Sequence, residues 1–326
     1  MARVGGRWHA LALAGAGAVA ALLLAISGCT AVSRVGGDAP LATPTLAASA
    51  TPGTATPAAH FAVTMRRDVV YGPLAMEQLD LCLPRGAVGA RPGMVVIHGG
   101  AWSFGDKLGF DGYCAYFASL GFVAASINYR LAPRWVWPAQ LLDAQLAVRY
   151  LRAHALSLSL DPGRMCAMGE SSGGHLAVFL GSQATIRPGD TASLWPDESP
   201  RVSCVVDLYG PVDLTRPLPQ LDGYQTFQRL LGGATRASDL AAYRDASPLF
   251  LISPASAPTL IIQGDHDVTV PPQQSRLLQS ALQVAGVRVT YIAYDGGHNL
   301  TGLTAAQRAD LTRQMGVFAL EQTAAG

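Results

Sequence analysis

Charged side chains are scarce in this sequence. Aspartate, glutamate, lysine and arginine make up 14% of its 326 residues, and the formal net charge is +1. There is no basic stripe and no acidic tail, which argues against nucleic-acid binding. Half of the residues are hydrophobic, so the chain has ample material for a large buried core and is not intrinsically disordered as a whole.

Cysteine is also rare. The sequence has five cysteines, and none of their spacings is that of a zinc site or a C-x-x-C pair. Cys82, Cys114, Cys166 and Cys204 each lie within an apolar stretch, so we expect buried free thiols. An extracytoplasmic location would permit one or two disulfides among them, and the sequence leaves their pairing open.

The first 28 residues have the organisation of a signal peptide. Arg3 and Arg7 form a positively charged start, and residues 10–26 are an uncharged run followed by small residues. The alternative is a retained membrane helix, although the run falls short of the roughly 20 residues that cross a bilayer comfortably. The sequence ISGC resembles the bacterial lipobox, which implies cleavage before Cys29 and lipidation of that residue. We therefore expect an exported protein, held by a lipid anchor on the extracytoplasmic side of the bacterial cell membrane.

Residues 29–60 differ in composition from the rest of the chain. They are rich in Ala, Thr, Pro, Gly and Ser and have almost no large apolar side chains. Such a segment does not bury enough surface to order itself, so we expect a flexible tether. The remaining residues, 61–326, suffice for one large α/β domain.

Short apolar segments alternate with helical patterns along this domain. Helical spacing is clearest in residues 138–155, which begin with a proline. The alternation predicts an α/β fold with a mostly parallel central sheet and helices on both faces. Ligands of such sheets bind at the carboxyl ends of the strands, where the unusual loops of this sequence also lie. The expected strands are 77–83, 93–98, 122–129, 164–168, 202–210, 257–264 and 287–297.

The segment MCAMGESSGGHLA, residues 165–177, continues one of these strands and begins a helix. It contains the pattern G-x-S-x-G around Ser171, which by itself also fits a plain strand-to-helix turn. A strand before it and a helix after it are the context of a nucleophile elbow, a tight turn that holds a serine hydroxyl above the sheet. Ser172 does not fit the pattern, because Glu170 and Gly174 flank it at the two-residue spacing.

A serine hydroxyl needs a base to act as a nucleophile. His298 lies in the loop YDGGHNL after the last predicted strand, a position suited to a base that reaches over the cleft. His175, one turn beyond the serine, is expected to pack its helix instead. A carboxylate orients such a base, and the loop QGDHDVTVPP offers Asp265 and Asp267. The order Ser171, Asp267, His298 is the chain order expected of an α/β-hydrolase.

The segment HGGAW, residues 98–102, ends an early strand. Its glycines expose backbone N–H groups there. Together with the amide of Ser172, these groups can bind the oxyanion of a tetrahedral intermediate.

Five stretches together resemble the α/β-hydrolase esterases, on the side of the BD-FAE-like and hormone-sensitive-lipase-like carboxylesterases. They are HGGAWSFGDK, NYRLAPRWVWPAQLLDAQLAVRYL, DPGRMCAMGESSGGHLA, GDHDVTVPP and GGHN, in the order of the family. The resemblance implies an α/β-hydrolase fold with Ser171, Asp267 and His298 as the catalytic triad. It favours Asp267 over Asp265. The residues that match the family's G-x-x-D-x-x-V-P loop are Gly264, Asp267, Val270 and Pro271.

The same resemblance assigns the oxyanion hole. Gly100 and Ala101 match the family's donors, the amide of Ser172 completes the site, and Gly99 gives close approach. The family often has a third glycine where Ala101 stands, but alanine keeps the N–H. No helical cap precedes the first strands, which favours the capless groups of the family.

Other residues of the matched stretches are expected to act on structure or substrate. Arg130 and Asp143 are expected to form a structural ion pair rather than a substrate contact. Trp102 and Tyr209 are candidate substrate contacts. Residues 209–258 are either a partial wall over the cleft or a pair of surface helices packed on the sheet. The candidate lining residues of that wall are Tyr209, Tyr224, Phe227 and Leu231.

The function implied is a serine carboxylesterase that hydrolyses short-chain acyl esters through an acyl-enzyme. Its partners are a small-molecule ester or acylated sugar and, through the anchor, a membrane. No metal or organic cofactor and no nucleic acid is implied. The alternatives are an amidase, formamidase or peptidase on the same scaffold, and a binding protein that has lost catalysis.

Overall fold

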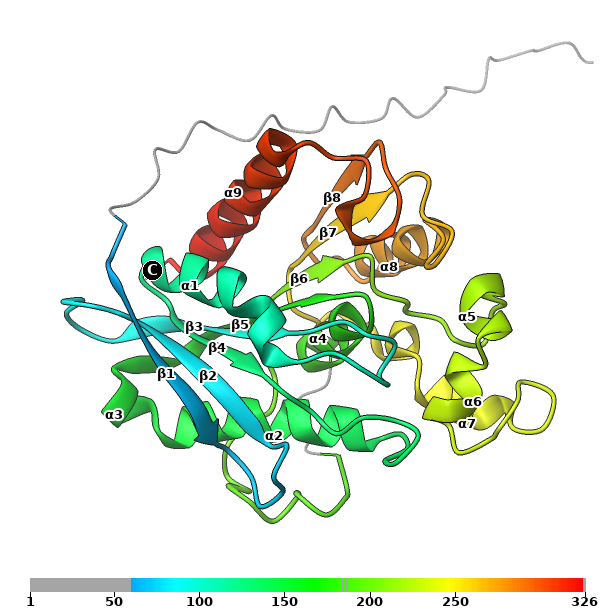
Figure 1. Ribbon diagram of the computed structural model, residues 1–326, viewed down its shortest axis with the longest axis horizontal. Coiled ribbons are helices and arrows are strands. Elements are labelled where there is room, and N and C mark those ends of the chain that lie inside the picture. Colours follow the sequence, from blue (N-terminus) through cyan, green and yellow to red (C-terminus); the bar gives the residue numbers. More distant parts are fainter. Residues whose placement is uncertain (1–59, 183–184, 186, 325–326) are drawn as a thin grey trace, which may run out of the picture. The chain divides into compact units, whose positions relative to one another are not determined.

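An eight-stranded sheet forms the centre of the computed structural model, which describes residues 60–182, 185 and 187–324 (Figure 1). The strands are β1 (Val63–Val70), β2 (Gln78–Pro84), β3 (Arg91–Ile97), β4 (Val123–Ile127), β5 (Leu160–Glu170), β6 (Cys204–Leu208), β7 (Thr259–Gly264) and β8 (Val289–Tyr294). Their order across the sheet is β1-β2-β4-β3-β5-β6-β7-β8. β2 runs antiparallel to β1 and to β4, and all other neighbours are parallel.

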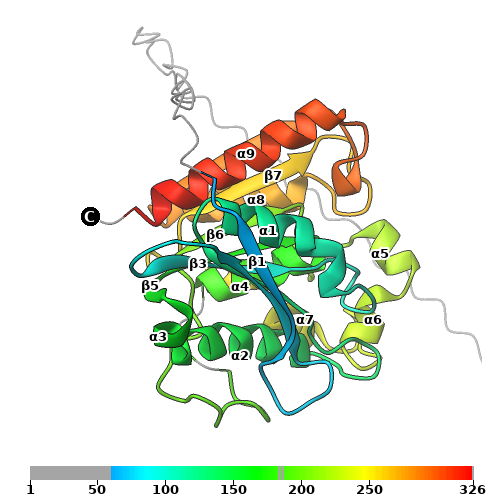
Figure 2. The same cartoon turned by 60° about the vertical axis from the view of Figure 1, so that its left-hand side comes forward.

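Helices cover both faces of this sheet. They are η1 (Lys107–Phe110), α1 (Asp111–Ser119), α2 (Ala139–Ala153), α3 (Ala155–Leu158), α4 (Ser172–Ser182), α5 (Pro219–Gly223), α6 (Thr226–Leu230), α7 (Leu240–Asp245), η2 (Pro248–Leu251), α8 (Gln273–Val284), η3 (His298–Leu300) and α9 (Ala305–Gln322). α1 and α9 pack on one face, in a core with Phe117 and Phe318 (Figures 1 and 2). α2, α4 and α8 pack on the other, with Leu146, Phe179 and Leu278. The arrangement confirms the predicted α/β-hydrolase fold.

β1 is the strand that the sequence patterning does not predict. Its sequence, VTMRRDVV, places Arg66, Arg67 and Asp68 in the middle of the strand, so apolar and polar residues do not alternate. The register with β2 shifts between Arg66 and Val69, and Asp68 has a φ of 55°. A charged, irregular strand is common at a sheet edge, where it discourages pairing with a second chain.

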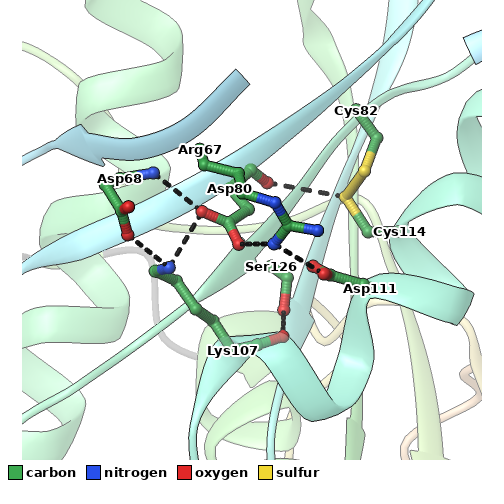
Figure 3. Close-up of a disulfide and its surroundings, with 8 residues drawn as sticks. All are labelled: Arg67, Asp68, Asp80, Cys82, Lys107, Asp111, Cys114 and Ser126. Atoms are coloured by element: carbon green, nitrogen blue, oxygen red, sulfur yellow. Dashed lines mark hydrogen bonds and ion pairs between the residues drawn. A yellow bond between two sulfur atoms is a disulfide. The ribbon is translucent and has the colours of Figure 1, made fainter. Parts of the chain in front are cut away.

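The two disulfides correct the expectation of free thiols. Cys166 and Cys204 are bonded to each other, as are Cys82 and Cys114. Cys166 and Cys204 are register partners on β5 and β6, with Cα atoms 4.6 Å apart. Cys82 on β2 joins Cys114 on α1, with Cα atoms 5.8 Å apart (Figure 3). The apolar stretches around these residues are neighbours in the core, so burial brings the sulfur atoms together.

A charged cluster lies beside the disulfide of Cys82 (Figure 3). Lys107 Nζ lies 2.9 Å from Asp80 Oδ1 and 2.8 Å from Asp68 Oδ1, and Arg67 reaches the same Asp80 at 3.0 Å. Lys107 and Asp80 are buried, so each compensates the charge of the other. Because Lys107 directly follows the glycine-rich loop 98–106, its ion pair with Asp80 holds one end of that loop against β2.

The amino-terminal predictions fall outside this description. The signal peptide, Cys29 and residues 30–59 of the tether are not among the described residues. Within the described ranges, no helix is both long enough and apolar enough to cross a membrane.

Candidate active site

Ser171 lies in a tight turn between β5 and α4. Its φ is 52°, in the left-handed region that side chains seldom adopt. The flanking glycines make the turn possible, because a Cβ on Gly173 would collide with the backbone carbonyl of Ile97 and one on Gly169 would collide with the backbone of Gly173. The geometry is that of a nucleophile elbow.

Ser171, His298 and Asp267 form a hydrogen-bonded chain. His298 Nε2 lies 3.0 Å from Ser171 Oγ, and His298 Nδ1 lies 2.6 Å from Asp267 Oδ2. The other oxygen of Asp267 accepts the backbone N–H groups of Thr269 and Val270, each at 2.9 Å. Asp267 is buried, whereas the His298 side chain is 13% exposed. The carboxylate is therefore fixed by its own loop and aims one oxygen at the imidazole.

The neighbouring acid and histidine of the same loop point elsewhere. Asp265 is exposed, and in the described part of the chain it makes no hydrogen bond to His298. His266 Nε2 lies 2.9 Å from Asp295 Oδ1, and both side chains are exposed to solvent. The preference for Asp267 over Asp265 thus agrees with the geometry.

The glycine-rich loop faces the same cleft through Gly99, Gly100 and Ala101. Gly100, Ala101 and Trp102 have φ values of 116°, 51° and 56°. A side chain at Gly100 would collide with the carbonyl of Phe104. Left-handed backbone costs about 1 kcal/mol or more at each non-glycine residue, so packing must hold Ala101 and Trp102 in place.

The backbone amides of this loop and of the elbow are available to a ligand. Within the described residues, the N–H groups of Gly100, Ala101 and Ser172 have no hydrogen-bond acceptor. Ser172 begins α4 and its side chain is buried, with Oγ 3.4 Å from the hydroxyl of Tyr129. An amide at the start of a helix, such as that of Ser172, favours a bound negative charge.

Trp102 and Tyr209 do not line the cleft, which corrects their expected role as substrate contacts. Trp102 is 1% exposed, and its indole packs edge-on against His175 with ring centroids 4.9 Å apart. Tyr209 is fully buried and packs against the His298 ring at 4.7 Å. The left-handed backbone at both positions, with φ of 56° and 45°, goes with side chains buried in the core. This turn conformation has no signature in the apolar pattern.

Residues 209–258 contribute one wall of the cleft. Of their four candidate lining residues, Tyr224 lines it and is 63% exposed, whereas Phe227 is buried. The cleft has a volume of about 740 Å³. The residues that line it are Gly99, Gly100, Ala101, Ser103, Phe104, Gly105, Phe110, Glu170, Ser171, Gln220, Leu221, Gly223, Tyr224, Gln225, Thr226, Arg229, Thr269, His298 and Asn299.

Glu170 and Arg229 are charged cleft residues that the sequence analysis did not single out as functional. Burial raises the pKa of Glu170, although the Tyr113 hydroxyl donates a 2.9 Å hydrogen bond to its Oε1. The sequence feature that points to a role for Glu170 is its position directly before Ser171. Arg229 lies on α6 and is exposed to solvent.

Arg130 and Asp143 form the expected ion pair away from the cleft lining. Arg130 Nη2 lies 2.7 Å from Asp143 Oδ1, and both side chains are buried. The same guanidinium reaches Asp190 at 2.6 Å. The pair joins the segment after β4 to α2, so its role is structural.

Comparison with known proteins decides the family. The BD-FAE family model matches residues 79–282, from β2 to α8. The chain belongs to the BD-FAE family. The segment of this BD-FAE chain that the family model matches includes Ser171 and Asp267, and His298 lies beyond it.

Two mycobacterial relatives are named esterases. The BD-FAE chain is 29% identical to esterase LipC of Mycobacterium tuberculosis over 79% of its own length and 66% of the relative's. It is 28% identical to esterase LipQ of the same organism, over 76% of its own length and 60% of the relative's. The chain thus spans less than two thirds of the length of either relative.

Solved structures share the fold of this BD-FAE chain. A truncated carbohydrate esterase from gut microbiota has a TM-score of 0.71 and 26% identity, and the match covers 82% of this chain and 98% of that one. An acetyl ester-xyloside bifunctional hydrolase from Caldicellulosiruptor lactoaceticus has a TM-score of 0.63 and 26% identity, over 75% and 88% of the two chains.

Proposed function

We propose that this protein is a serine carboxylesterase that hydrolyses short-chain acyl esters. The observation that carries the proposal is the hydrogen-bonded chain from Asp267 through His298 to Ser171, together with the fact that Ser171 lines the same cleft as Gly100 and Ala101. Its membership of the BD-FAE family and its similarity to named esterases support the same reaction class.

The first half of the reaction forms an acyl-enzyme. Ser171 Oγ attacks the ester carbonyl carbon while His298 Nε2 takes the hydroxyl proton. Asp267 fixes the imidazole and stabilises its charged form. The amides of Gly100, Ala101 and Ser172 donate to the oxyanion, each such donor being worth roughly 3–4 kcal/mol of transition-state stabilisation. The intermediate collapses when the C–O bond breaks and His298 returns the proton to the leaving alcohol.

The second half reverses these roles with water. His298 takes a proton from a water molecule, whose oxygen attacks the acyl carbon. The same amides hold the second oxyanion. The bond to Ser171 Oγ then breaks, His298 reprotonates the serine, and the carboxylic acid leaves.

The cleft favours a small acyl group and a bulky alcohol. Phe104 and Tyr224 line the cleft and are 65% and 63% exposed, so they offer aromatic surface to a large group rather than closing a tunnel. Aromatic faces of this kind suit the apolar face of a sugar ring. The two solved structures compared above are those of a carbohydrate esterase and an acetyl ester-xyloside bifunctional hydrolase. We infer that acetyl to butyryl esters, including acylated sugars, are the substrate class.

The test is a profile of kcat/KM on nitrophenyl esters from acetate to palmitate. Each methylene that the cleft leaves in water forgoes about 0.8 kcal/mol. We expect a maximum between acetate and butyrate and little action on long-chain triglycerides. A maximum at decanoate or longer would mean a deep acyl tunnel and would overturn the short-chain proposal.

We also propose that the protein is exported and anchored through Cys29. The two disulfides support this proposal, because disulfides persist in oxidising compartments and are rare in the cytosol. A single acyl chain binds a membrane only weakly, so stable anchoring needs two or three chains on the terminal cysteine. Cys29→Ala should release the protein from the membrane fraction, and failure of a fatty-acid analogue to label the wild type would contradict the anchor.

A further inference from the structure

Arg229 is a cation of the cleft that has no ion-pair partner in the described part of the chain. It lies on α6, lines the same cleft as Ser171 and is exposed to solvent. Within residues 60–182, 185 and 187–324, no ion pair or side-chain hydrogen bond of Arg229 is found. Most arginines of this chain behave differently and bind carboxylates or backbone carbonyls, as Arg130 and Arg149 do.

The acidic residue nearest in sequence is already bound. Asp222, the acid of α5, places Oδ1 2.7 Å from Nη1 of Arg236 and accepts the backbone N–H of Leu218 through Oδ2 at 2.9 Å. Arg236 is held in turn by the rings of Phe227 and Tyr243, at 5.2 and 4.9 Å from their centroids. Each carboxylate oxygen of Asp222 therefore has a partner of its own, and Arg229 is not one of them.

Glu170 is the acid among the residues that line the cleft. It precedes Ser171 in the elbow, and its Oε1 accepts the hydroxyl of Tyr113. An anionic group of a substrate would be repelled near Glu170 and attracted near Arg229. The two charges thus orient such a substrate, with its charge toward α6.

We propose that Arg229 is a specificity-determining residue that selects esters whose alcohol part carries a carboxylate. The inference rests on the proposed esterase function, because a short acyl group leaves no place for a charge and the charge must then lie on the alcohol. A guanidinium donates two parallel hydrogen bonds to a carboxylate, which suits this planar group. One cation balances one negative charge, so a monoanionic carboxylate fits the site.

The test compares two acetate esters that differ in charge, 4-acetoxybenzoate and 4-acetoxybenzamide. Both esters release acetate. For each protein we take the kcat/KM of the benzoate divided by that of the benzamide. Dividing this ratio in a variant by the ratio in the wild type cancels the intrinsic reactivities of the two esters. An exposed charge pair with good geometry predicts that Arg229→Gln lowers this ratio about three- to tenfold. The amide substrate should change less than twofold, which shows that the variant is folded and active. Arg229→Lys should retain part of the preference.

Arg66→Gln is the matched control. Arg66 is an exposed arginine on β1 that forms no ion pair within the described ranges, and it does not line the cleft. Arg66→Gln changes the net charge by the same amount as Arg229→Gln and should leave the ratio of the two kcat/KM values unchanged. An unchanged ratio in Arg229→Gln, or an equal change in Arg66→Gln, would overturn the proposal.

Calorimetric titration of 4-hydroxybenzoate separates this inference from the esterase itself. The compound is the alcohol product and binds without turnover, and Arg229→Gln should weaken its binding by the same factor as the substrate ratio. Weaker binding in the variant with no hydrolysis of either ester by the wild type would overturn the esterase and support the anion site. Hydrolysis with equal binding in both proteins would overturn the anion site alone.

Discussion

The indole nitrogen of Trp102 lies 3.2 Å from Nδ1 of His175. This hydrogen bond joins the glycine-rich loop to α4, the helix that begins at the nucleophile elbow. His175 Nε2 lies 2.8 Å from the carbonyl of Ala246, so the ring donates there and accepts from Trp102 as a neutral imidazole. Ala101, whose amide is a proposed oxyanion donor, directly precedes Trp102. The packing of the indole therefore positions that amide relative to Ser171.

Trp102→Phe tests this positioning role. The ring volume stays largely filled but the hydrogen bond to His175 is lost, so the amide of Ala101 drifts from the oxyanion. Misplacement of about 1 Å costs up to roughly a hundredfold in rate, and we expect kcat to fall about ten- to a hundredfold with KM nearly unchanged. The measurement is steady-state kinetics on a nitrophenyl acetate.

Trp137→Phe is the control for that experiment. Trp137 is also buried, also packs against His175, and donates its indole N–H to Asp245 at 2.8 Å. It lies outside the glycine-rich loop, so its loss should lower stability and leave kcat within a few-fold. Equal losses of kcat in both variants would mean that Trp102 supports the fold in general and does not specifically position the amide of Ala101.

His175 predicts a pH dependence of stability. Burial lowers the pKa of His175 from 6.5 to about 4. Between these values the unfolded chain binds a proton that the folded chain does not, so the free energy of unfolding falls as the pH falls from 6.5 to 4. The part due to this residue is at most roughly 3 kcal/mol. Urea unfolding of the wild type and of His175→Gln across this range should show a shallower decline in the variant, and parallel declines would refute the assignment.

Asp267→Asn should lower turnover far more than Asp265→Asn. Asp267 accepts from Nδ1 of His298, and an amide in its place stabilises neither the correct tautomer nor the charged imidazole. We expect a loss of kcat of about a thousandfold or more for Asp267→Asn and less than twofold for the exposed Asp265. The comparison uses the same ester for both variants, and similar losses would contradict the assignment of the carboxylate.

The two disulfides predict how many thiols react with an alkylating agent and how much the bridges add to the free energy of unfolding. Alkylation of the denatured, unreduced protein should leave Cys82, Cys114, Cys166 and Cys204 unmodified by mass spectrometry. Replacing Cys82 and Cys114 together by alanine opens a link between residues 32 apart in sequence and should cost roughly 2–4 kcal/mol in urea unfolding. Full modification of all four thiols before reduction would show that the bridges do not form.

Local motifs account for most of what the sequence predicts correctly. The strand, turn and helix around Ser171 follow from glycines that no other residue can replace at such close contacts. The loops that carry Asp267 and His298 follow strands whose parallel order brings them to one edge of the sheet. Seven of the eight strands have a clear apolar pattern, and the loops after the carboxyl ends of β3, β5, β7 and β8 line the cleft.

The sequence predicts less well wherever tertiary packing decides. β1 is held by pairing with β2 rather than by its own pattern, since its centre is charged. Pairing of Cys166 with Cys204 depends on which strands become neighbours, which is a property of the whole sheet. Trp102 lies in the glycine-rich loop and Tyr209 directly follows β6, but both have left-handed backbone and their side chains are buried in the core.

The most direct test of the central claim is kcat/KM for a short-chain acetate ester in Ser171→Ala, measured beside Ser172→Ala and the wild type. The nucleophile and its base act as a unit, so we expect Ser171→Ala to lose about a thousandfold or more, as should His298→Ala, with the fold intact by circular dichroism. Ser172→Ala keeps the backbone amide of the oxyanion site and should remain active. An active Ser171→Ala together with an inactive Ser172→Ala would contradict the account.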